Sequence, residues 1–325
     1  MLRGNKVWEF IKKYFLWFLI AAAIAVPFIF QGYWLRVLTS ALMFAVLAQA
    51  ANIIAGYAGC PAIGNILFFG VGAYVTAILM TALKLPFFVA LLGCGIFGAL
   101  YATIWGLPLL RIKGHYFVMA TMGLNYLSKE LVNNLSITNG SRGIMVPLPN
   151  FEFDLLIFFY FMMLAALACI MLVIWKMERS KIGYALKAIK ADEEAAKSTG
   201  INAASYKTIA WAISAFFTSV AGGIYAYWIT FIDPASAFDT VNSTKMFIMY
   251  SFGGPGTLWG PVLGALSLEF LSETIWGSFS QLHYLVLGVV MILIIMFIPG
   301  GIYPMLKDAP FSWKQYKEKL RKGRL

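Results

Sequence analysis

Long apolar runs recur along the whole chain, and short polar stretches separate them. A helix needs about 20 mostly apolar residues to cross the hydrocarbon core of a bilayer. The pattern predicts about ten membrane-spanning helices, at approximately 14–31, 34–55, 62–82, 86–109, 115–135, 155–175, 208–229, 243–256, 258–275 and 283–299. The eighth and ninth are the least distinct, because the eighth is short and only a GGPGT bend separates them.

Residues 178–207 break this pattern, because they are polar and charged while both flanks are apolar. A short helix is predicted over 183–190, with Leu186 and Ile189 on one side. After a bend near Ala191, Asp192 can cap a second helix with Glu193 and Glu194 in its first turn, where acidic side chains suit the helix dipole.

The second short helix continues through Ala195 and Ala196, and Gly200 fits the left-handed conformation that commonly ends a helix. Small residues on both helices would let a partner approach closely. The stretch is therefore predicted to dock into another protein. A solvated amphipathic loop is the alternative, because the composition fits both.

Composition supports the membrane assignment. The chain has 325 residues, of which 61% are hydrophobic and 12% charged, and its mean hydropathy is +0.79. Soluble domains are about 45–50% apolar. We therefore predict an all-α polytopic membrane protein in which residues 1–325 form one transmembrane domain.

The net charge of +11 is concentrated beside the apolar runs. Most Lys and Arg residues lie in a tail at 1–13, at Arg111 and Lys113, in the stretch that leads into and through 178–207, and in a tail at 304–325. An even number of crossings places all four on one side, which the positive-inside rule makes the cytoplasm. Both termini are then cytoplasmic, and the other side receives Asp154, Asp233 and Asp239. The sequence does not have the basic stripe interleaved with aromatic residues that is typical of nucleic-acid binding, so this function is not predicted.

Two stretches rich in Gly and Pro, 55–73 and 251–265, read as broken helices. Irregular backbone at membrane depth is tolerated where it is buried in protein or lines a wet cavity. Candidates for a translocation path are Cys60, Pro61, Gly64 and Asn65 in the first stretch, and Gly253 and Gly254 in the second. Close helix packing is the alternative, with Gly256, Gly260 and Gly264 as a ridge of small residues. Asn65 adds a polar group, so the path is favoured for the first stretch.

Glu269 and Glu273 are four residues apart and share one helix face. Acidic residues inside membrane segments are functional candidates by default. The predicted topology places both toward the outer end of the ninth span, where water is available. They are added to the path candidates, with a role in a cavity or an outer gate.

The chain carries no pattern for its own catalysis. Gly93, Gly95 and Gly98 form a G-x-G-x-x-G motif inside an apolar span, where no strand precedes them, so they are predicted to pack helices. The sequence contains no Gly-Lys dipeptide and hence no G-x-x-x-x-G-K-[ST] loop for ATP. No catalytic constellation and no metal-ligand spacing stands out. The chain is predicted not to be an enzyme and to bind no cofactor itself.

Four segments together carry a resemblance to a known family. GYALKAIKADEEAAKSTGIN, at 183–202, resembles the coupling loop of ABC-importer permeases for branched-chain amino acids. GYAGCPAIGNILFFGVGAY and FGGPGTLWGPVLGA resemble the two Gly-rich motifs of that family, and RIKGHYFVMATMG resembles the segment that marks its LivM type. The resemblance covers most of the chain, from about 51 to 305.

The resemblance implies a complex in a bacterial or archaeal cytoplasmic membrane. Its parts would be this chain, a second permease subunit of LivH type, two cytoplasmic ABC ATPase subunits that bind ATP and Mg²⁺, and an external solute-binding protein. ATP binding would move the coupling loop and switch the path between its two open states. The residues of the implied coupling loop are Gly183, Leu186, Ile189, Asp192, Glu193, Ala195, Ala196 and Gly200, and the last five of these would sit in a groove of the ATPase.

Other functions remain open at this point. Cys60, Pro61 and Asn65 depart from the residues usual in the family, and its relatives include permeases for urea and short amides. An ion-coupled secondary transporter is a further alternative, and it would need intramembrane charges near the bilayer midplane.

Overall fold

The computed structural model describes residues 25–27, 32–112, 114–147, 154–278, 288–289 and 301–303. The two basic tails, 1–13 and 304–325, lie outside the described residues, as do Lys113 and nearly all of the spans expected at 14–31 and 283–299. Predictions about those segments remain expectations.

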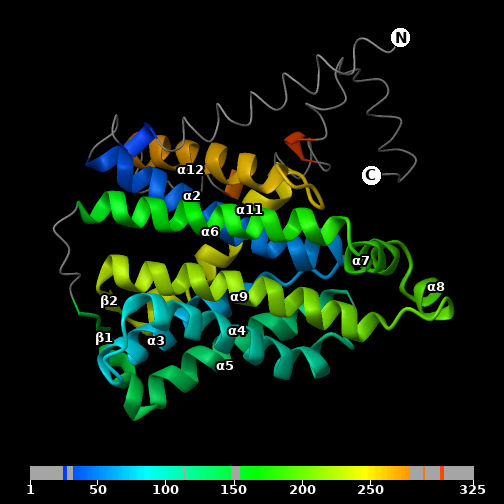
Figure 1. Ribbon diagram of the computed structural model, residues 1–325, viewed down its shortest axis with the longest axis horizontal. Coiled ribbons are helices and arrows are strands. Elements are labelled where there is room, and N and C mark those ends of the chain that lie inside the picture. Colours follow the sequence, from blue (N-terminus) through cyan, green and yellow to red (C-terminus); the bar gives the residue numbers. More distant parts are fainter. Residues whose placement is uncertain are drawn as a thin grey trace, which may run out of the picture.

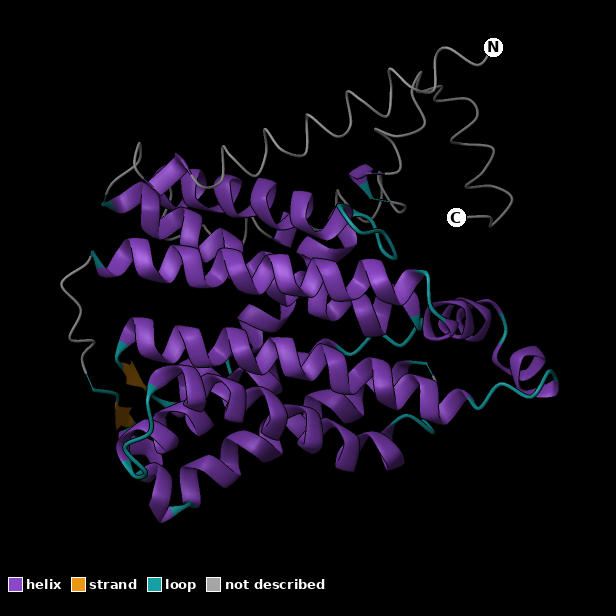
Figure 2. Ribbon diagram, in the orientation of Figure 1, coloured by secondary structure: helices purple, strands orange, loops and turns teal. Residues whose placement is uncertain are grey.

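The described residues are mostly helical (Figures 1 and 2). In chain order the helices are α2 (Tyr33–Ala51), the π-helix η1 (Asn52–Tyr57), the 3₁₀ turn η2 (Ile63–Ile66), α3 (Leu67–Thr81), α4 (Phe87–Leu109), α5 (His115–Asn134), the 3₁₀ turns η3 (Ser136–Thr138) and η4 (Gly140–Arg142), α6 (Leu155–Glu178), α7 (Lys181–Ala191), α8 (Glu193–Ser198), α9 (Ala203–Ile229), α10 (Pro234–Ala237), α11 (Thr240–Gly253) and α12 (Gly260–Ser278). Two short strands, β1 (Ile144–Met145) and β2 (Phe231–Ile232), pair antiparallel with Ile144 opposite Ile232.

The long helices form two groups that share one core (Figure 1). In one group α9 packs along α3 and α4, and in the other α2 packs along α6, α11 and α12. Contacts of α2 and α6 with α9 join the groups. The buried side chains are nearly all apolar, and Trp211, Tyr57 and Phe68 are the largest that are fully buried. Helices satisfy their own backbone groups, which is what a segment inside a bilayer requires.

Short polar side chains fix where several helices begin. The carboxylate of Asp154 accepts a hydrogen bond from Leu156 N at the start of α6, and Asp239 accepts one from Val241 N at the start of α11. Asp233 caps α10 in the same way. These caps satisfy amide groups that no carbonyl within the helix can reach. The three acidic residues thus cap helices, in addition to carrying the charge from which their side of the membrane was predicted.

Five described helical segments are long and apolar enough to cross a membrane: Tyr33–Tyr57, Ile63–Thr81, Phe87–Leu109, Leu155–Glu178 and Ala203–Ile229. They agree with five of the predicted spans, and the chain is a polytopic all-α protein. Helix α5 forms where a span was expected but is not one of the five. Helix α11 has 14 residues, or about 21 Å, which is short for a hydrocarbon core of about 30 Å. A total of about ten spans remains a prediction.

Helix α4 has one face that packs against other helices and one apolar, exposed face that is suited to contact with lipid. A Cβ on Gly98 would lie 1.9 Å from Ser219 Oγ, and one on Gly95 would lie 2.7 Å from the ring of Phe216. The packing role predicted for this glycine motif is confirmed, since both positions face α9. The other face is apolar and 57–66% exposed at Phe88, Leu92, Ile96, Leu100 and Ile104.

Candidate functional site

The polar stretch folds into α7 and α8, which meet at Asp192 and project from one end of the helices (Figure 1). The Asp192 carboxylate accepts hydrogen bonds from Glu194 N at 2.9 Å and from Ala195 N at 3.1 Å. Both the bend near Ala191 and the cap at Asp192 are confirmed. The first helix begins at Lys181, slightly earlier than predicted.

Gly200 follows the end of α8 and has the predicted left-handed conformation. The φ angle of Gly200 is +87°, a left-handed backbone that glycine adopts at little cost. The N–H of Ile201 donates to Ala196 O at 3.1 Å, which is the long hydrogen bond of a Schellman ending. Ile201 also packs against a small apolar cluster of Ile189, Ala196 and Ala203. This cluster joins α7 and α8 to the start of α9.

An ion pair fastens α8 to α9. Lys207 Nζ lies 2.7 Å from Glu193 Oε2, and the Lys207 side chain is 6% exposed. Lys197 Nζ lies 3.1 Å from the other oxygen of Glu193. Burial raises the pKa of Glu193, but hydrogen bonds from Lys207 and Lys197 outweigh burial and hold the pKa below its ordinary value. Glu193 is therefore ionised at neutral pH, which keeps the buried Lys207 paired.

The predicted coupling residues divide into a buried set and an exposed set. Leu186, Ile189 and Ala196 are at most 4% exposed, and a Cβ on Gly183 would lie 2.2 Å from Met177 O. These four contact their own chain, and of them only Ala196 belongs to the group expected in a partner's groove, which stays a prediction. Hydrophobic side chains on a short helix turn toward the nearest core, and here that core belongs to the chain. Of the other predicted residues, Asp192, Ala195 and Gly200 are exposed and Glu193 is partly exposed. The exposed surface around them also includes Tyr184, Lys187 and Glu194.

The two Gly-rich stretches contact each other through Asn52. Its Oδ1 accepts a hydrogen bond from Gly256 N at 2.7 Å, and its Nδ2 donates to Thr257 O at 2.9 Å. Gln49 Nε2 donates to Leu258 O in the same loop. A Cβ on Gly56 would lie 2.6 Å from Gly256 N, so glycine is needed for this approach. Gln49 and Asn52 were not among the predicted site residues. The only sign of their role in the sequence is that two amide side chains lie within an apolar run.

Asn65 is fully buried and uses both ends of its amide. Its Nδ2 donates to Ser214 Oγ at 3.1 Å and to Thr218 Oγ1 at 3.3 Å, and its Oδ1 accepts from Trp211 Nε1 at 3.1 Å. The polar group that favoured a path instead fastens η2 to α9. For Asn65 these contacts fit the packing alternative, and a role in the path stays a prediction.

The glycine candidates also lie in close helix contacts. A Cβ on Gly64 would lie 2.0 Å from Thr121 O of α5, and one on Gly253 would lie 2.0 Å from Gly260 O. Gly254 ends α11 with φ +126°. These positions fit the packing alternative. Gly256 lies before the start of α12, so it is not part of the helical ridge expected with Gly260 and Gly264.

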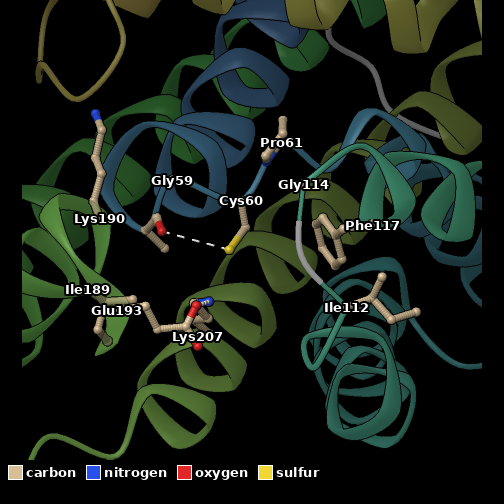
Figure 3. Close-up of a pocket in the computed structure, with 11 residues that line it drawn as sticks. Gly59, Cys60, Pro61, Ile112, Gly114, Phe117, Ile189, Lys190, Glu193 and Lys207 are labelled. Atoms are coloured by element: carbon tan, nitrogen blue, oxygen red, sulfur yellow. Dashed lines mark hydrogen bonds and ion pairs between the residues drawn. The ribbon is translucent and has the colours of Figure 1, made fainter. Parts of the chain in front are cut away.

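Cys60 and Pro61 line a cavity of about 150 Å³ that also reaches the coupling loop (Figure 3). The structure thus brings two path candidates together with the loop, although they are far apart in sequence. Burial raises the pKa of the Cys60 thiol, which stays protonated at neutral pH. The cavity is smaller than the roughly 300–1,000 Å³ typical of ligand sites. Its other walls include Ile112, Phe117, Ile189, Lys190, Glu193 and Lys207.

Glu269 and Glu273 both accept hydrogen bonds from α2, and Glu273 remains partly exposed. Tyr33 Oη donates a hydrogen bond to Glu273, and Ser40 Oγ donates to Glu269 Oε1 at 2.8 Å. Glu269 is 6% exposed, so it lies against α2 instead of in the water expected at the outer end of a span, and its role in a cavity or an outer gate stays a prediction. An apolar run predicts the length of a helix but not the neighbouring helix that covers it, which here is α2. The structure does not bring either residue to the cavity at Cys60.

Comparison with known proteins gives matches over most of the chain. Residues 33–295 match the family described as "Branched-chain amino acid transport system / permease component". The chain is 28% identical to the high-affinity branched-chain amino acid transport system permease protein LivM of Salmonella typhimurium, over 91% of this chain and 76% of the relative. It is 23% identical to a probable branched-chain amino acid transport permease protein LivM of Methanocaldococcus jannaschii, over 86% and 94%.

One further relative differs in its named solute. The fructose import permease protein FrcC of Rhizobium meliloti is 25% identical over 72% of this chain and 61% of the relative. No solved structure matches the chain significantly.

Proposed function

Because this chain belongs to the family of permease components of branched-chain amino acid transport systems, we propose that it forms part of the membrane path of an ATP-driven importer for those amino acids. The sequence contains no ATP-binding loop, so ATP would be bound and hydrolysed by separate ABC ATPase subunits. The other proposed partners are a LivH-type permease subunit and an external solute-binding protein.

The observation that carries the proposal is the loop formed by α7 and α8. Its buried residues pack on the chain and hold the loop in place. Its exposed residues form a surface on α7 and α8 that takes no part in the packing of the membrane-spanning helices. A loop that is folded this firmly and yet exposed is suited to docking on a partner, since little ordering entropy is lost on binding.

The proposed side of the membrane follows from charge. The turn at Arg111, the helices α7 and α8 and the start of α9 lie at one end of the molecule, because residues from all of these segments surround the cavity at Cys60 or adjoin it. This end carries Arg111, Lys176, Arg179, Lys181, Lys187 and Lys197 among its cations. It would face the cytoplasm by the positive-inside rule.

Branched-chain amino acids are the proposed solutes because the relatives that cover most of this chain are named for them. The fructose permease relative shows that the family also contains proteins named for other solutes. Urea or short amides are the alternative within the same transporter class.

Co-purification of the tagged chain from its native membrane tests the docking surface. We expect a P-loop ATPase to be recovered, and we expect Ala195→Trp to abolish its recovery, because Ala195 is exposed on α8. The matched control is Ile137→Trp, an exposed apolar position before β1 at the other end of the molecule. Equal recovery with both variants, or no ATPase with the native chain, would contradict the proposal.

A further inference from the structure

Helices α7 and α8 and the start of α9 form one firmly connected unit. Ile189, Ala196 and Ala203 make a shared apolar cluster, and the Glu193–Lys207 ion pair crosses from α8 to α9. A partner that moves α8 would therefore move α7 as well. The question is what α7 contacts inside the molecule.

Lys190, near the end of α7, reaches the broken end of α2. Its Nζ donates a hydrogen bond to Gly56 O at 2.7 Å. The last carbonyl groups of a helix have no amide donor within the helix, and a cation suits the negative end of the helix dipole. The residue as a whole is exposed, but burial around the amine lowers the pKa of Lys190. The lysine stem also lies against Gly59, where a Cβ would be 3.1 Å from Lys190 Cγ.

Gly56 is also the place where the second Gly-rich stretch touches the first. A Cβ on Gly256 would lie 3.1 Å from Gly56 O and 3.6 Å from Lys190 Nζ. The amide of Gly256 is held by Asn52, which belongs to the same π-helix as Gly56. The Lys190 amine thus lies at the junction of η1 and the loop 254–258.

This junction is made of backbone that can rearrange. Short π-helical segments are rare and are frequently found at functional sites. Gly254 and Gly256 have φ angles of +126° and +76°, and glycine moves between such conformations at little cost. The neighbouring residue of η1, Tyr57, is held by a different helix, because its Oη donates a hydrogen bond to Glu178 at the end of α6. The Tyr57 contact therefore does not connect α7 with the junction, whereas the Lys190 contact does.

We propose that Lys190 is the positioning residue that transmits movement of α7 to both Gly-rich segments, the π-helix η1 and the loop 254–258. This inference rests on the proposed function, since an ATPase partner must move the loop. Lys190 touches no solute in this role. It makes the two stretches, which are about 200 positions apart, respond together to one external event.

The test compares three variants in the purified complex with its ATPase. Lys190→Met keeps the stem and removes the amine, Lys190→Arg keeps a donor of similar reach, and Lys187→Met removes an exposed lysine of the same helix. Two quantities are measured: amino acid taken up per ATP hydrolysed in proteoliposomes, and hydrogen exchange at 52–57 and 254–258 with and without an ATP analogue.

We expect Lys190→Met to retain the ATPase and its hydrolysis but to take up at least about tenfold less solute per ATP, because movement of α7 would no longer reach both segments. The analogue should change exchange at both segments in the native complex, in Lys190→Arg and in Lys187→Met, but not in Lys190→Met. If Lys190→Met showed the same uptake per ATP and the same exchange changes as the native complex, the inference about Lys190 would be overturned, but the proposed function would stand. A native chain that binds no ATPase would instead overturn the proposed function.

Discussion

The carboxylate of Glu193 lies between two lysines, of which Lys197 is exposed and Lys207 is buried. Glu193→Gln would leave the buried Lys207 without a charged partner. We expect a loss of about 1–3 kcal/mol in the stability of the loop, between the values for exposed and fully buried ion pairs. Thermal unfolding of the purified chain and protease cleavage within 181–207 measure it. Glu194→Gln is the control, since Glu194 is 70% exposed, and an equal effect of both variants would contradict the account.

The same ion pair predicts a dependence on pH. The pKa of Glu193 is lower in the folded chain than its ordinary value, so the ionised form is the one that stabilises the loop. That stabilisation is complete above the ordinary pKa and is lost as the pH falls through the folded value. We expect hydrogen exchange in α8 to rise in that acidic range in the native chain. In Glu193→Gln this rise should be absent, and its persistence would assign it to another group.

Asn65 supplies a second prediction at the same scale. Asn65→Leu would leave Trp211 Nε1 without its acceptor and remove two further hydrogen bonds from a buried site. We expect a stability loss of about 1–3 kcal/mol, seen as a lower Tm, with any loss of transport following from it. Asn133→Leu is the control at a more exposed helix position. An unchanged Tm together with lost transport would favour the path interpretation of Asn65.

Sequence patterns predicted some single residues well and others poorly. Asp192 and Gly200 were predictable because capping and left-handed backbone depend on immediate neighbours. Asn65 and Glu269 were not, because their partners lie on α9 and α2, far away in sequence. A polar residue in an apolar run looks the same whether it faces water or a buried partner.

At the scale of elements, close contact between helices explains several glycines. A Cβ on Gly64 would lie 2.0 Å from a backbone oxygen of α5, whereas Gly123 on the same α5 has open space around its Cβ position. We expect Gly64→Ala to cost at least about 2 kcal/mol and to lower the yield of folded chain. Gly123→Ala should be neutral or slightly stabilising, because alanine favours helix. Yield and Tm of the two variants check this, and similar values for both would contradict the packing.

The main elements were predictable because apolar runs of helix length are long and distinct. The five clear spans and the two loop helices all formed near their predicted positions. The π-helical end of α2 was not predictable, since it depends on contacts with Lys190 and with the loop 254–258. The short α11 also depends on context, because its end is set by Gly254.

At the scale of the molecule, charge predicted that the Arg111 turn and the 178–207 stretch lie at one end, and the shared cavity at Cys60 confirms it. The contact between the two Gly-rich stretches could not be predicted from the sequence, because it joins residues about 200 positions apart. That junction places the exposed helices next to backbone that can rearrange. Under the proposed function, movement of a partner docked at this end would reach that junction.

Uptake into proteoliposomes that contain the chain with its permease partner, ATPase subunits and binding protein tests the central claim most directly. We predict that leucine enters only when ATP is present on the ATPase side, and that isoleucine and valine compete whereas fructose and urea do not. Uptake by this chain alone, driven by an ion gradient without ATP, would contradict the account and identify a secondary transporter.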